Sequence, residues 1–382
     1  MADTADGSAQ RLVHLDLLRG LIMLTMALDH VRAFVVREHP FEIWSQALPH
    51  YDAVLPFLTR LLTHFCAPGF FFLMGAGVTL FASARRRDDW STGRIARHLV
   101  TRGVLLVVVQ QLIENPAWIL GSMGAAKEPA SGGFQPAGVV LGVLYALGMS
   151  MALWGLLLRL PSIGVLLISA AAIVATQTLT PSIADAATSY SPLLRLLLIP
   201  GKTGVWFVIY PVIPWLGLTG MGIVFGRALA DGKRLAPQAL AWGAVFLILF
   251  VMVRSVGGFG NIHVPVPEGW IGFLNVTKYP PSLAFIALTL GVDLIVLGVL
   301  AAFCSGGEFW ALPLLTFGRS ALFFYIAHLY VYAVIGFAFP HGAPIAMAYP
   351  PWFVGLLILY PLCRRYERFK HRRPTNSLWR FF

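Results

Sequence analysis

The chain has 382 residues, of which 58% are hydrophobic and only 12% are charged. Soluble domains carry about twice that share of charged residues, so a water-soluble surface cannot be built from this composition. Intrinsic disorder is also excluded, because it requires low hydrophobicity and high charge. The composition therefore predicts an integral membrane protein.

The apolar residues fall in runs that are long enough to cross a membrane, since about 20 helical residues span a hydrocarbon core about 30 Å thick. We expect about ten spans, which cover approximately residues 15–36, 58–83, 98–120, 137–158, 163–180, 205–228, 236–253, 282–303, 313–338 and 352–363. The remaining residues are too few for a soluble catalytic domain. The predicted fold is all-α: a polytopic integral membrane protein with a single transmembrane domain (15–363), an N-terminal tail (1–14) and a basic C-terminal tail (364–382).

Arginine and lysine are concentrated in alternate connections, and cytoplasmic connections carry the excess of these residues. The basic set comprises Arg85, Arg86, Arg87, Arg94, Arg97, Arg227, Lys233, Arg234, Arg364, Arg365, Arg368, Lys370, Arg372, Arg373 and Arg380. The opposite set is sparse and comprises Arg37, Lys127, Arg195, Lys202 and Lys278. Both termini are therefore predicted to be cytoplasmic, which accounts for the net charge of +11 without a nucleic-acid partner. Binding of an anionic ligand at the inner face is the alternative explanation.

The first fourteen residues are small and polar and show no signal peptide. The expected location is therefore a bacterial inner membrane. Cys66, Cys304 and Cys363 are odd in number and lie in or next to predicted spans, so no disulfide framework is expected. The sequence has no metal-ligand spacing, and no metal site is predicted. The oligomeric state stays open, with a homo-oligomer among the alternatives.

Ionisable residues inside a membrane span cost about 2.5 to 3.5 kcal/mol on insertion scales, so they are retained where they pair or line a cavity. In the first predicted span, Asp16 and Arg19 lie three residues apart near the cytoplasmic end. They share one helical face, which favours an ion pair, with a ligand contact as the alternative. Asp29 and His30 lie in the outer half of the same span. For His30 a functional role is favoured over a structural one.

His64 lies in the outer half of the second predicted span, one turn after Arg60. A lone histidine on an apolar helix face is usually a core residue, but His30 and His64 are expected at similar depth on consecutive helices. They therefore predict a shared polar pocket. Asp29 can fix the tautomer of an imidazole and raise its basicity, as a general base requires.

Later spans contribute further polar groups. The third predicted span ends at the outer face with Gln110, Gln111, Glu114 and Asn115. The ninth carries Arg319 inside its cytoplasmic end. Tyr325 and His328 follow three residues apart on one face, with His328 near the middle of the membrane.

Two outer connections also carry candidate ligands. Residues 37–57 contain His39, Glu42, His50 and Asp52. Residues 255–281 contain Asn275, Lys278 and Tyr279 directly before the eighth span, where these side chains could hydrogen-bond a polar substrate. Anchoring of Lys278 and Tyr279 in the membrane interface is the alternative.

Glycine and proline recur in two of the predicted spans. The second contains Pro68, Gly75 and Gly77, and the sixth contains Pro214, Gly220 and Gly222. This pattern could be a faint parallel repeat. We favour the simpler interpretation that small residues allow neighbouring helices to approach closely.

Five segments carry most of these polar and small residues. They are LDLLRGLIMLTMALDH (15–30), THFCAPGFFFLMG (63–75), PWLG (214–217), FLNVTKYPPS (273–282) and FGRSALFFY (317–325). In this order they resemble the transmembrane acyltransferases related to heparan-α-glucosaminide N-acetyltransferase, in particular the bacterial members. The segments are spread through most of the chain, so the resemblance extends to the architecture.

The resemblance implies an enzyme that takes acetyl from cytoplasmic acetyl-CoA and delivers it to an amine or hydroxyl of a sugar or glycan on the far side. The helices would surround a CoA channel that opens inward. The lysosomal enzyme of this family has an asparagine at the position of His30 and a catalytic histidine in its first non-cytoplasmic loop. In this sequence that loop offers His39 and His50.

For acyl transfer, we predict that His30 is the general base, oriented by Asp29, with His64 second in line. The acceptor or the developing oxyanion would be held by Asn275, Lys278, Tyr279, His39 and His328. The CoA phosphates would lie near Asp16, Arg19, Arg85, Arg86 and Arg319, because guanidinium groups suit phosphate recognition. Direct transfer and a transient acyl-histidine both stay open.

A secondary transporter or permease for a small polar solute is the alternative function, because such proteins also use buried polar residues and broken helices. Against it, the polar residues are expected at the two faces, and no inverted repeat is visible. A membrane subunit that scaffolds other proteins is a third alternative. It would leave the interior ionisable groups unexplained.

Overall fold

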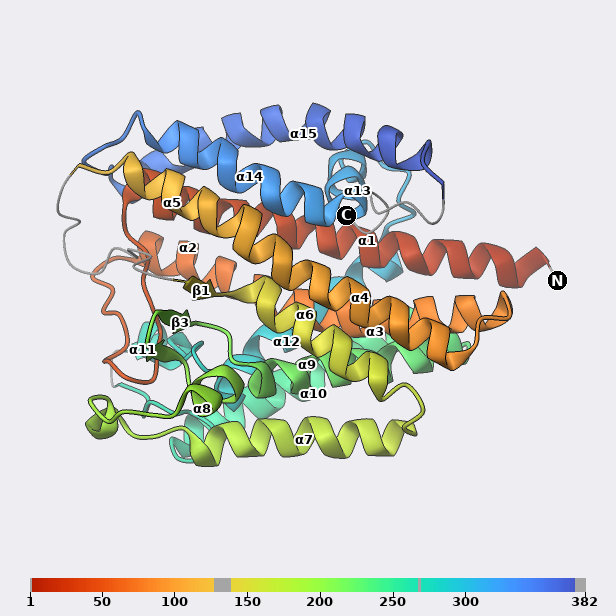
Figure 1. The fold of residues 1–382 in the computed structure, drawn as a ribbon, viewed down its shortest axis with the longest axis horizontal. Coiled ribbons are helices and arrows are strands. Elements are labelled where there is room, and N and C mark those ends of the chain that lie inside the picture. The colour runs from red at the N-terminus through yellow and green to blue at the C-terminus, as the bar shows by residue number, and fades with distance from the viewer. Residues whose placement is uncertain (1, 127–138, 267–268, 375–382) are drawn as a thin grey trace.

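The computed structural model describes residues 2–126, 139–266 and 269–374, with side chains from Val13 onward. Long helices lie side by side in one bundle whose two ends differ (Figure 1). The loop end, on the left of Figure 1, holds the short strands and the long connections. The basic end, on the right, holds the arginine-rich connections after α3 and α9 and the C-terminal part of α15. Lys127, residues 137–138 of the predicted fourth span and residues 375–382 of the predicted tail lie outside the described residues.

The first half of the chain folds into helices joined mostly by short turns. These are α1 (Ala2–Val31), the π-helical turn η1 (Arg32–Val36), α2 (Val54–His64), α3 (Cys66–Arg87), α4 (Thr92–Val109), the π-helical turn η2 (Gln110–Glu114), α5 (Asn115–Met123), α6 (Val143–Leu156) and α7 (Ser162–Leu179). Within the bundle, α4 packs on α6 and α3 packs on α9.

The second half adds further helices and a small sheet at the loop end. The helices are η3 (Ile183–Asp185), α8 (Pro192–Leu197), α9 (Val212–Ala230), α10 (Leu235–Val256), α11 (Gly269–Leu274), α12 (Leu283–Phe303), α13 (Ala311–Arg319), α14 (Ala321–Gly336), η4 (Ile345–Ala348) and α15 (Tyr349–His371). The strands are β1 (Val139–Leu141), β2 (Gly201–Thr203) and β3 (Trp206–Val208). The sheet order is β1-β3-β2, with β1 parallel and β2 antiparallel to β3.

Seven helical stretches of the described residues are long and apolar enough to cross a membrane: Val54–Arg87, Thr92–Met123, Ser162–Leu179, Val212–Ala230, Leu235–Val256, Leu283–Phe303 and Ile345–His371. The bent pair α13–α14 gives an eighth if it forms one span. An all-α, multi-pass membrane protein is thereby confirmed. The predicted first and fourth spans correspond to α1, which carries several charges, and to α6, which has 14 residues. The count of about ten stays a prediction.

The fourth, sixth, ninth and tenth spans differ most from their predicted bounds. The described part of the fourth begins with β1, and its helix α6 starts only at Val143. The sixth does not begin as a helix, because Trp206–Val208 is β3 and Pro211 disfavours helical backbone in the residue before it. The ninth is broken at Ser320, where α13 and α14 meet at 97°. Next to the break, a Cβ on Gly318 would lie 2.0 Å from the Asp16 carbonyl oxygen, so α13 is held closely against α1. The tenth is longer than predicted, since α15 continues to His371.

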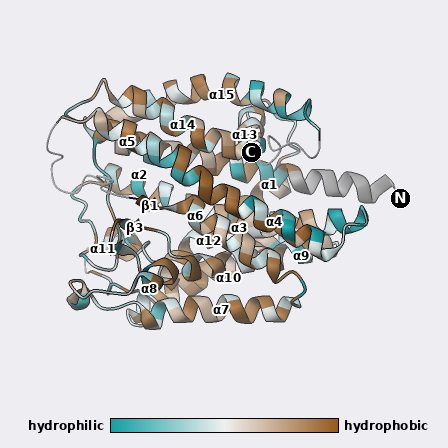
Figure 2. Ribbon diagram, viewed as in Figure 1, coloured by the Kyte–Doolittle hydropathy of each residue, from teal (hydrophilic) through white to brown (hydrophobic). Residues whose placement is uncertain are grey.

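Hydrophobic residues make up most of the length of the helices, as Figure 2 shows, and many of them are exposed on the outside of the bundle. Leu112, Leu167, Ile248 and Leu357 are 59–71% exposed. A soluble protein normally buries most side chains of this size and polarity. A lipid environment makes this exposure favourable, in agreement with the membrane spans.

Glycines let α3 and α9 touch at the backbone. A Cβ on Gly75 would lie 2.0 Å from the carbonyl oxygen of Thr219, and a Cβ on Gly222 would lie 2.0 Å from that of Phe72. No side chain fits at such distances, which confirms the close approach predicted for these glycines. Gly77, two residues further along α3, has no atom within 4 Å of the same position.

Gly75→Ala is expected to destabilise the protein by about 1–3 kcal/mol, because the added methyl must push α9 away from α3. Gly77→Ala is the matched control on the same helix. It is expected to be neutral or slightly stabilising, since alanine has the higher helix propensity. Thermal unfolding of the purified protein in detergent measures both. Equal Tm values for the two variants would contradict the backbone contact.

Candidate active site

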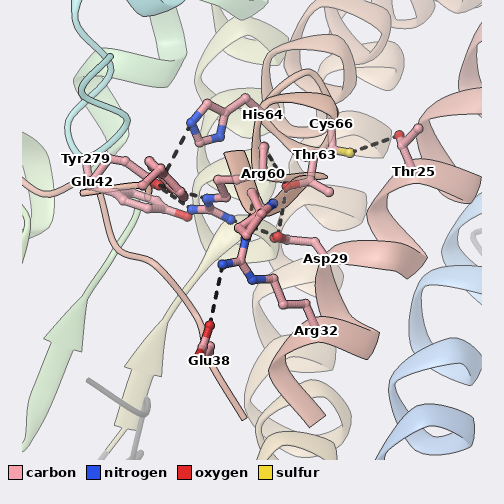
Figure 3. A network of polar contacts seen from close by, with 12 residues as sticks. Thr25, Asp29, Arg32, Glu38, Glu42, Arg60, Thr63, His64, Cys66 and Tyr279 are labelled. Atoms are coloured by element: carbon pink, nitrogen blue, oxygen red, sulfur yellow. Dashed lines mark hydrogen bonds and ion pairs between the residues drawn. The ribbon is translucent and has the colours of Figure 1, made fainter. Parts of the chain in front are cut away.

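A buried arginine joins the first two helices and the segment between them (Figure 3). Arg60 of α2 is 1% exposed. Its guanidinium donates to the Glu42 carboxylate from Nε at 2.8 Å and from Nη2 at 2.6 Å, and to Oδ1 of Asp29 from Nη1 at 2.8 Å. Thr63 donates to the same Asp29 oxygen at 2.9 Å. A two-point arginine–carboxylate pair fixes orientation as well as distance, so Arg60 sets how α1, α2 and their connection lie together.

Glu42 extends this network to a distant part of the chain. Burial opposes its ionisation, but the charge and hydrogen bonds of Arg60, together with His64 and Lys278, outweigh burial and lower the pKa of Glu42 to about 2. The Glu42 carbonyl accepts hydrogen bonds from the N–H groups of Lys278 and Tyr279 at 3.0 and 2.9 Å. The Trp44 N–H donates to the Tyr279 carbonyl at 2.9 Å. The segment before α12 is thereby held beside the end of α1.

These contacts border a cavity of about 80 Å³ at the loop end. Its walls come from α1, α5, α6, α14 and the segments before α9 and α12. The polar and aromatic lining residues are Asp29, His30, His39, Phe41, Glu114, Trp118, Tyr210, Lys278, Tyr279 and Tyr325. Five of the predicted site residues therefore meet around one cavity: Asp29, His30, His39, Lys278 and Tyr279.

His30 is hydrogen-bonded to a second histidine. Its Nδ1 lies 2.5 Å from Nε2 of His328, and Nδ1 of His328 lies 3.0 Å from the carbonyl oxygen of Phe324. The partner of His30 is thus His328 and not Asp29, which corrects the predicted orientation of His30 by Asp29. Successive helical residues point about 100° apart, so Asp29 faces Arg60 while His30 faces α14.

The two histidines of the first outer connection have different surroundings. His39 lines the cavity, with its ring 6.4 Å from that of Trp118. Burial lowers the pKa of the His39 imidazole to about 4. His50, in contrast, has a side chain that is 63% exposed and lies 3.0 Å from Asp52. The geometry therefore favours His39 over His50 as the loop histidine of the site.

Besides His328, two residues predicted for catalysis or acceptor binding do not line the cavity. His64 is 3% exposed, and its Nε2 lies 3.9 Å from the Glu42 carboxylate, behind the Arg60 network. Asn275 donates from its side chain to the Pro49 carbonyl at 2.9 Å, and its own carbonyl accepts from Arg254 at 3.1 Å. Both residues support the walls of the site.

Lys278 and Tyr279 are each 3% exposed, so the alternative of interfacial anchoring is wrong. They lie inside the protein because their backbone is paired with Glu42. The Lys278 ammonium lies 5.3 Å from the centre of the Tyr279 ring. It forms no salt bridge with another described residue, and it faces the cavity. A buried cation in this position can bind negative charge that develops in the cavity.

The structure also assigns cavity positions that the sequence left without a role. Tyr325 donates from its hydroxyl to Oε1 of Glu114 at 2.8 Å, and both residues line the cavity. The sequence identified Glu114 only as a polar group at the outer face of the membrane, and Tyr325 only as a residue on the same helix face as His328. Trp118 packs edge-on against His30, with ring centres 5.2 Å apart. Trp118 and Tyr210 carried no signal, since aromatic residues are common in membrane spans.

At the basic end, the predicted ion pair in the first span is confirmed. Arg19 donates to Asp16 at 2.7 Å. Arg319, at the break between α13 and α14, lies 3.7 Å from Asp16 and 3.8 Å from Glu367. Arg102 of α4, which the sequence analysis missed, lies within electrostatic range of Arg19. Arg19 lies on α1, which also carries Asp29 and His30, and Arg102 lies on α4, which continues through η2 to Glu114. Arg319 ends α13 directly before α14, which carries Tyr325.

The remaining predicted phosphate ligands lie elsewhere. Arg85 pairs with Asp88 at 2.7 Å, and its guanidinium lies 5.3 Å from the centre of the Trp90 ring. Arg86 lines a different cavity, between α3, α6 and α9. Of the predicted phosphate ligands, Asp16, Arg19 and Arg319 thus lie together, whereas Arg85 and Arg86 lie apart from them.

The chain is a multi-pass helical bundle with a cavity that histidines, carboxylates and a lysine line. The family model of the catalytic region of heparan-alpha-glucosaminide N-acetyltransferase matches residues 11–256, more than half of the chain. The chain belongs to this family, whose members are acetyl-CoA-dependent N-acetyltransferases of the membrane. No match was found among curated proteins. Membership of this family identifies the protein as an enzyme, and not as the transporter or scaffolding subunit that were the alternatives.

Arg60→Met is expected to destabilise the protein by about 3–5 kcal/mol, because it leaves Asp29 and Glu42 buried without their cation. Arg87→Met is the control, since Arg87 is exposed at the basic end and pairs with no described acid. Thermal unfolding in detergent measures both variants. If Arg60→Met and Arg87→Met have the same Tm, Arg60 does not have the central role in stability that its contacts indicate.

The low pKa of His39 predicts a pH effect on stability. Below about pH 6.5 the unfolded chain binds a proton at this histidine, whereas the folded protein binds it only near pH 4. Acidification through this window therefore favours unfolding. His39→Gln should lose less Tm than the parent between pH 7 and pH 4. His50→Gln, at the exposed histidine, should follow the parent, and equal curves for all three proteins would refute the prediction.

Proposed function

We propose that the protein transfers an acetyl group from acetyl-CoA, bound from the basic end, to the amine of a sugar or glycan in the cavity at the loop end. The observation that carries this proposal is the hydrogen-bonded series from the Phe324 carbonyl through His328 to His30 at the cavity wall. Family membership supplies the acyl donor and the reaction type.

The proposed sidedness follows the distribution of arginine and lysine. Cytoplasmic connections carry the excess of these residues, so the basic end faces the cytoplasm and both termini lie there. The loop end then faces the periplasm of a bacterial inner membrane. With α1 and α6 counted as spans, the chain crosses the membrane about ten times. Acetyl-CoA and the acceptor therefore approach from opposite sides.

The hydrogen bonds of His328 define the tautomer of His30. A carbonyl oxygen can only accept, so Nδ1 of His328 carries the hydrogen that points to Phe324. In a neutral imidazole the other nitrogen is then an acceptor, and Nδ1 of His30 donates to it. This leaves Nε2 of His30 as a lone-pair acceptor. His30 is thus prepared to accept a proton as a general base.

The reaction balances without a further reagent. Nε2 of His30 accepts a proton from the acceptor amine while the amine nitrogen bonds to the thioester carbonyl carbon. The negative charge on the carbonyl oxygen is stabilised by the Lys278 ammonium. When the carbon–sulfur bond breaks, the leaving thiolate takes the proton from His30. The products are the acetylated amine and CoA, and His30 returns to its starting form.

Glu114 is proposed to position the acceptor. Its carboxylate lines the cavity and is oriented by the hydroxyl of Tyr325. A carboxylate offers about four acceptor sites, more than Tyr325 can fill, so it can also receive hydroxyl or amine hydrogens of a sugar. His39, held neutral near pH 7 by burial, adds a further hydrogen-bonding group on the cavity wall.

The acyl donor is proposed to enter along α1, α4 and α14. Arg19 lies on α1, Arg102 lies on α4, and Arg319 ends α13 directly before α14. Their guanidinium groups are offered to the CoA phosphates. Arg19 precedes His30 by eleven residues of α1, which corresponds to about 16 Å. The phosphates and the thioester would thus occupy opposite ends of one path through the bundle.

Purified His30→Ala protein is expected to lose about 10²- to 10⁴-fold in kcat, because the general base is removed. The assay measures transfer of labelled acetyl from acetyl-CoA to glucosamine. His328→Ala should cause a smaller loss of kcat, since the base remains while its tautomer is no longer fixed. The KM for acetyl-CoA should stay close to the parental value in both variants.

His50→Ala is the control, because this exposed histidine lies outside the cavity. It should retain parental activity. Transfer by His30→Ala at the parental rate would overturn the assignment of the base. If His39→Ala loses 10²-fold or more while His30→Ala does not, His39 is the base instead.

A further inference from the structure

A second cavity lies at the basic end of the bundle and has no part in the proposed reaction. It has a volume of about 380 Å³ and lies between α3, α9 and the connection from α6 to α7. Val143, at the start of α6, lines the proposed active site, whereas Leu157, just after α6, lines this second cavity. At 1.5 Å per residue, the two cavities are about 21 Å apart along α6.

Three arginines from three parts of the chain meet at this cavity. Arg86 comes from α3, Arg159 from the α6–α7 connection and Arg227 from α9. Arg227 donates to the Leu160 carbonyl at 2.8 Å. Arg86 and Arg159 are exposed and pair with no acid among the described residues. Their guanidinium groups are therefore available to a ligand.

The charges around this cavity do not balance. Its lining includes three guanidinium groups and a single carboxylate, Asp231. Arg86 and Arg227 repel each other, and Asp231 offsets only one of the positive charges. The hydroxyl group of Ser162 also lines the wall, whereas the Thr79 hydroxyl there already donates to the Ile223 carbonyl at 3.1 Å. Converging guanidinium and hydroxyl donors with excess positive charge are the chemistry that recognises a phosphate ester.

Next to the second cavity, an apolar surface faces away from the helix bundle. Leu157 lines the cavity and is 36% exposed. Leu156, Ile163 and Leu167 on the same hairpin are 62–67% exposed. Only 28% of the apolar stretch of α7 is buried inside the protein, so this helix faces outward. A phosphate-bearing lipid would use both the arginines and this surface, whereas a nucleotide would use the arginines alone.

We propose that the second cavity binds the headgroup phosphate of an anionic phospholipid through Arg86, Arg159 and Arg227, with the acyl chains along the outer face of α6 and α7. Basic pockets between membrane helices on the cytoplasmic side recognise such headgroups. The bound lipid joins the α6–α7 hairpin to α3 and α9. This site does not depend on acetyl transfer, although the phosphates of CoA share the same chemistry.

The full chain, purified in detergent, provides the test. Binding of phosphatidylglycerol is measured by native mass spectrometry and by the rise in Tm, against phosphatidylcholine with the same acyl chains. The variant is Arg86→Gln/Arg159→Gln, which removes two exposed arginines without breaking a described ion pair. Arg364→Gln/Arg365→Gln removes the same charge from exposed positions of α15 and is the matched control.

The parent and the α15 variant should bind phosphatidylglycerol and gain Tm, because a ligand of the folded state stabilises it. Arg86→Gln/Arg159→Gln should bind it about tenfold or more weakly, since each arginine near an anionic lipid contributes roughly 1 kcal/mol. Phosphatidylcholine should have little effect on any of the proteins.

A second arm replaces the lipid by CoA. Stabilisation by CoA should be equal in the parent and in Arg86→Gln/Arg159→Gln if the cavity belongs to a lipid. Loss of CoA stabilisation with unchanged lipid binding would overturn the proposal and assign the arginines to the nucleotide. Equal lipid binding by all three proteins, or none by the parent, would also overturn it. Acetyl transfer is not part of either readout, so failure of the proposed reaction leaves the result interpretable.

Discussion

The site depends on one buried ion network, in which Arg60 binds Asp29 and Glu42 at the same time. Charges removed from water are stable only when their partners are held in good geometry. Lys278 and the buried Arg32 add further positive charge close to these carboxylates. The network connects α1, α2 and the segment before α12, which together form much of the cavity wall. It thereby positions the residues that line the cavity as well as stabilising the fold.

Local properties of the sequence were sufficient to predict the class of fold. The length of the apolar runs and the rarity of charged residues predicted the membrane spans. The three-residue spacing of Asp16 and Arg19 predicted their ion pair. Predictions were weaker where packing decides the backbone. The break at Ser320 depends on a glycine contact between α13 and α1, two helices that are far apart in the sequence.

The candidate site was also predictable only in part, because packing between helices that are distant in the sequence decides which of its residues meet. His30, Lys278 and His39 were recognised as polar residues at the outer level, and all three line the cavity. The sequence paired His30 with Asp29 and His64, its neighbours along the chain. Its actual partner is His328, which is 298 residues away. A single sequence contains no information on such a pairing, because nothing close to either histidine in the chain identifies its partner.

The family model matches the chain only as far as residue 256, whereas later residues also line the cavity. Lys278, Tyr325 and the partner of His30 all come from the last third of the chain. The first two helices and their connection already contain the buried Arg32 and Arg60 close to Asp29 and Glu42, so these carboxylates do not depend on Lys278 for positive charge. The cavity wall, in contrast, is complete only when the segment before α12 and helix α14 lie beside α1. A chain that ended with the family match would keep the Arg60 network and lack three of the groups that surround His30.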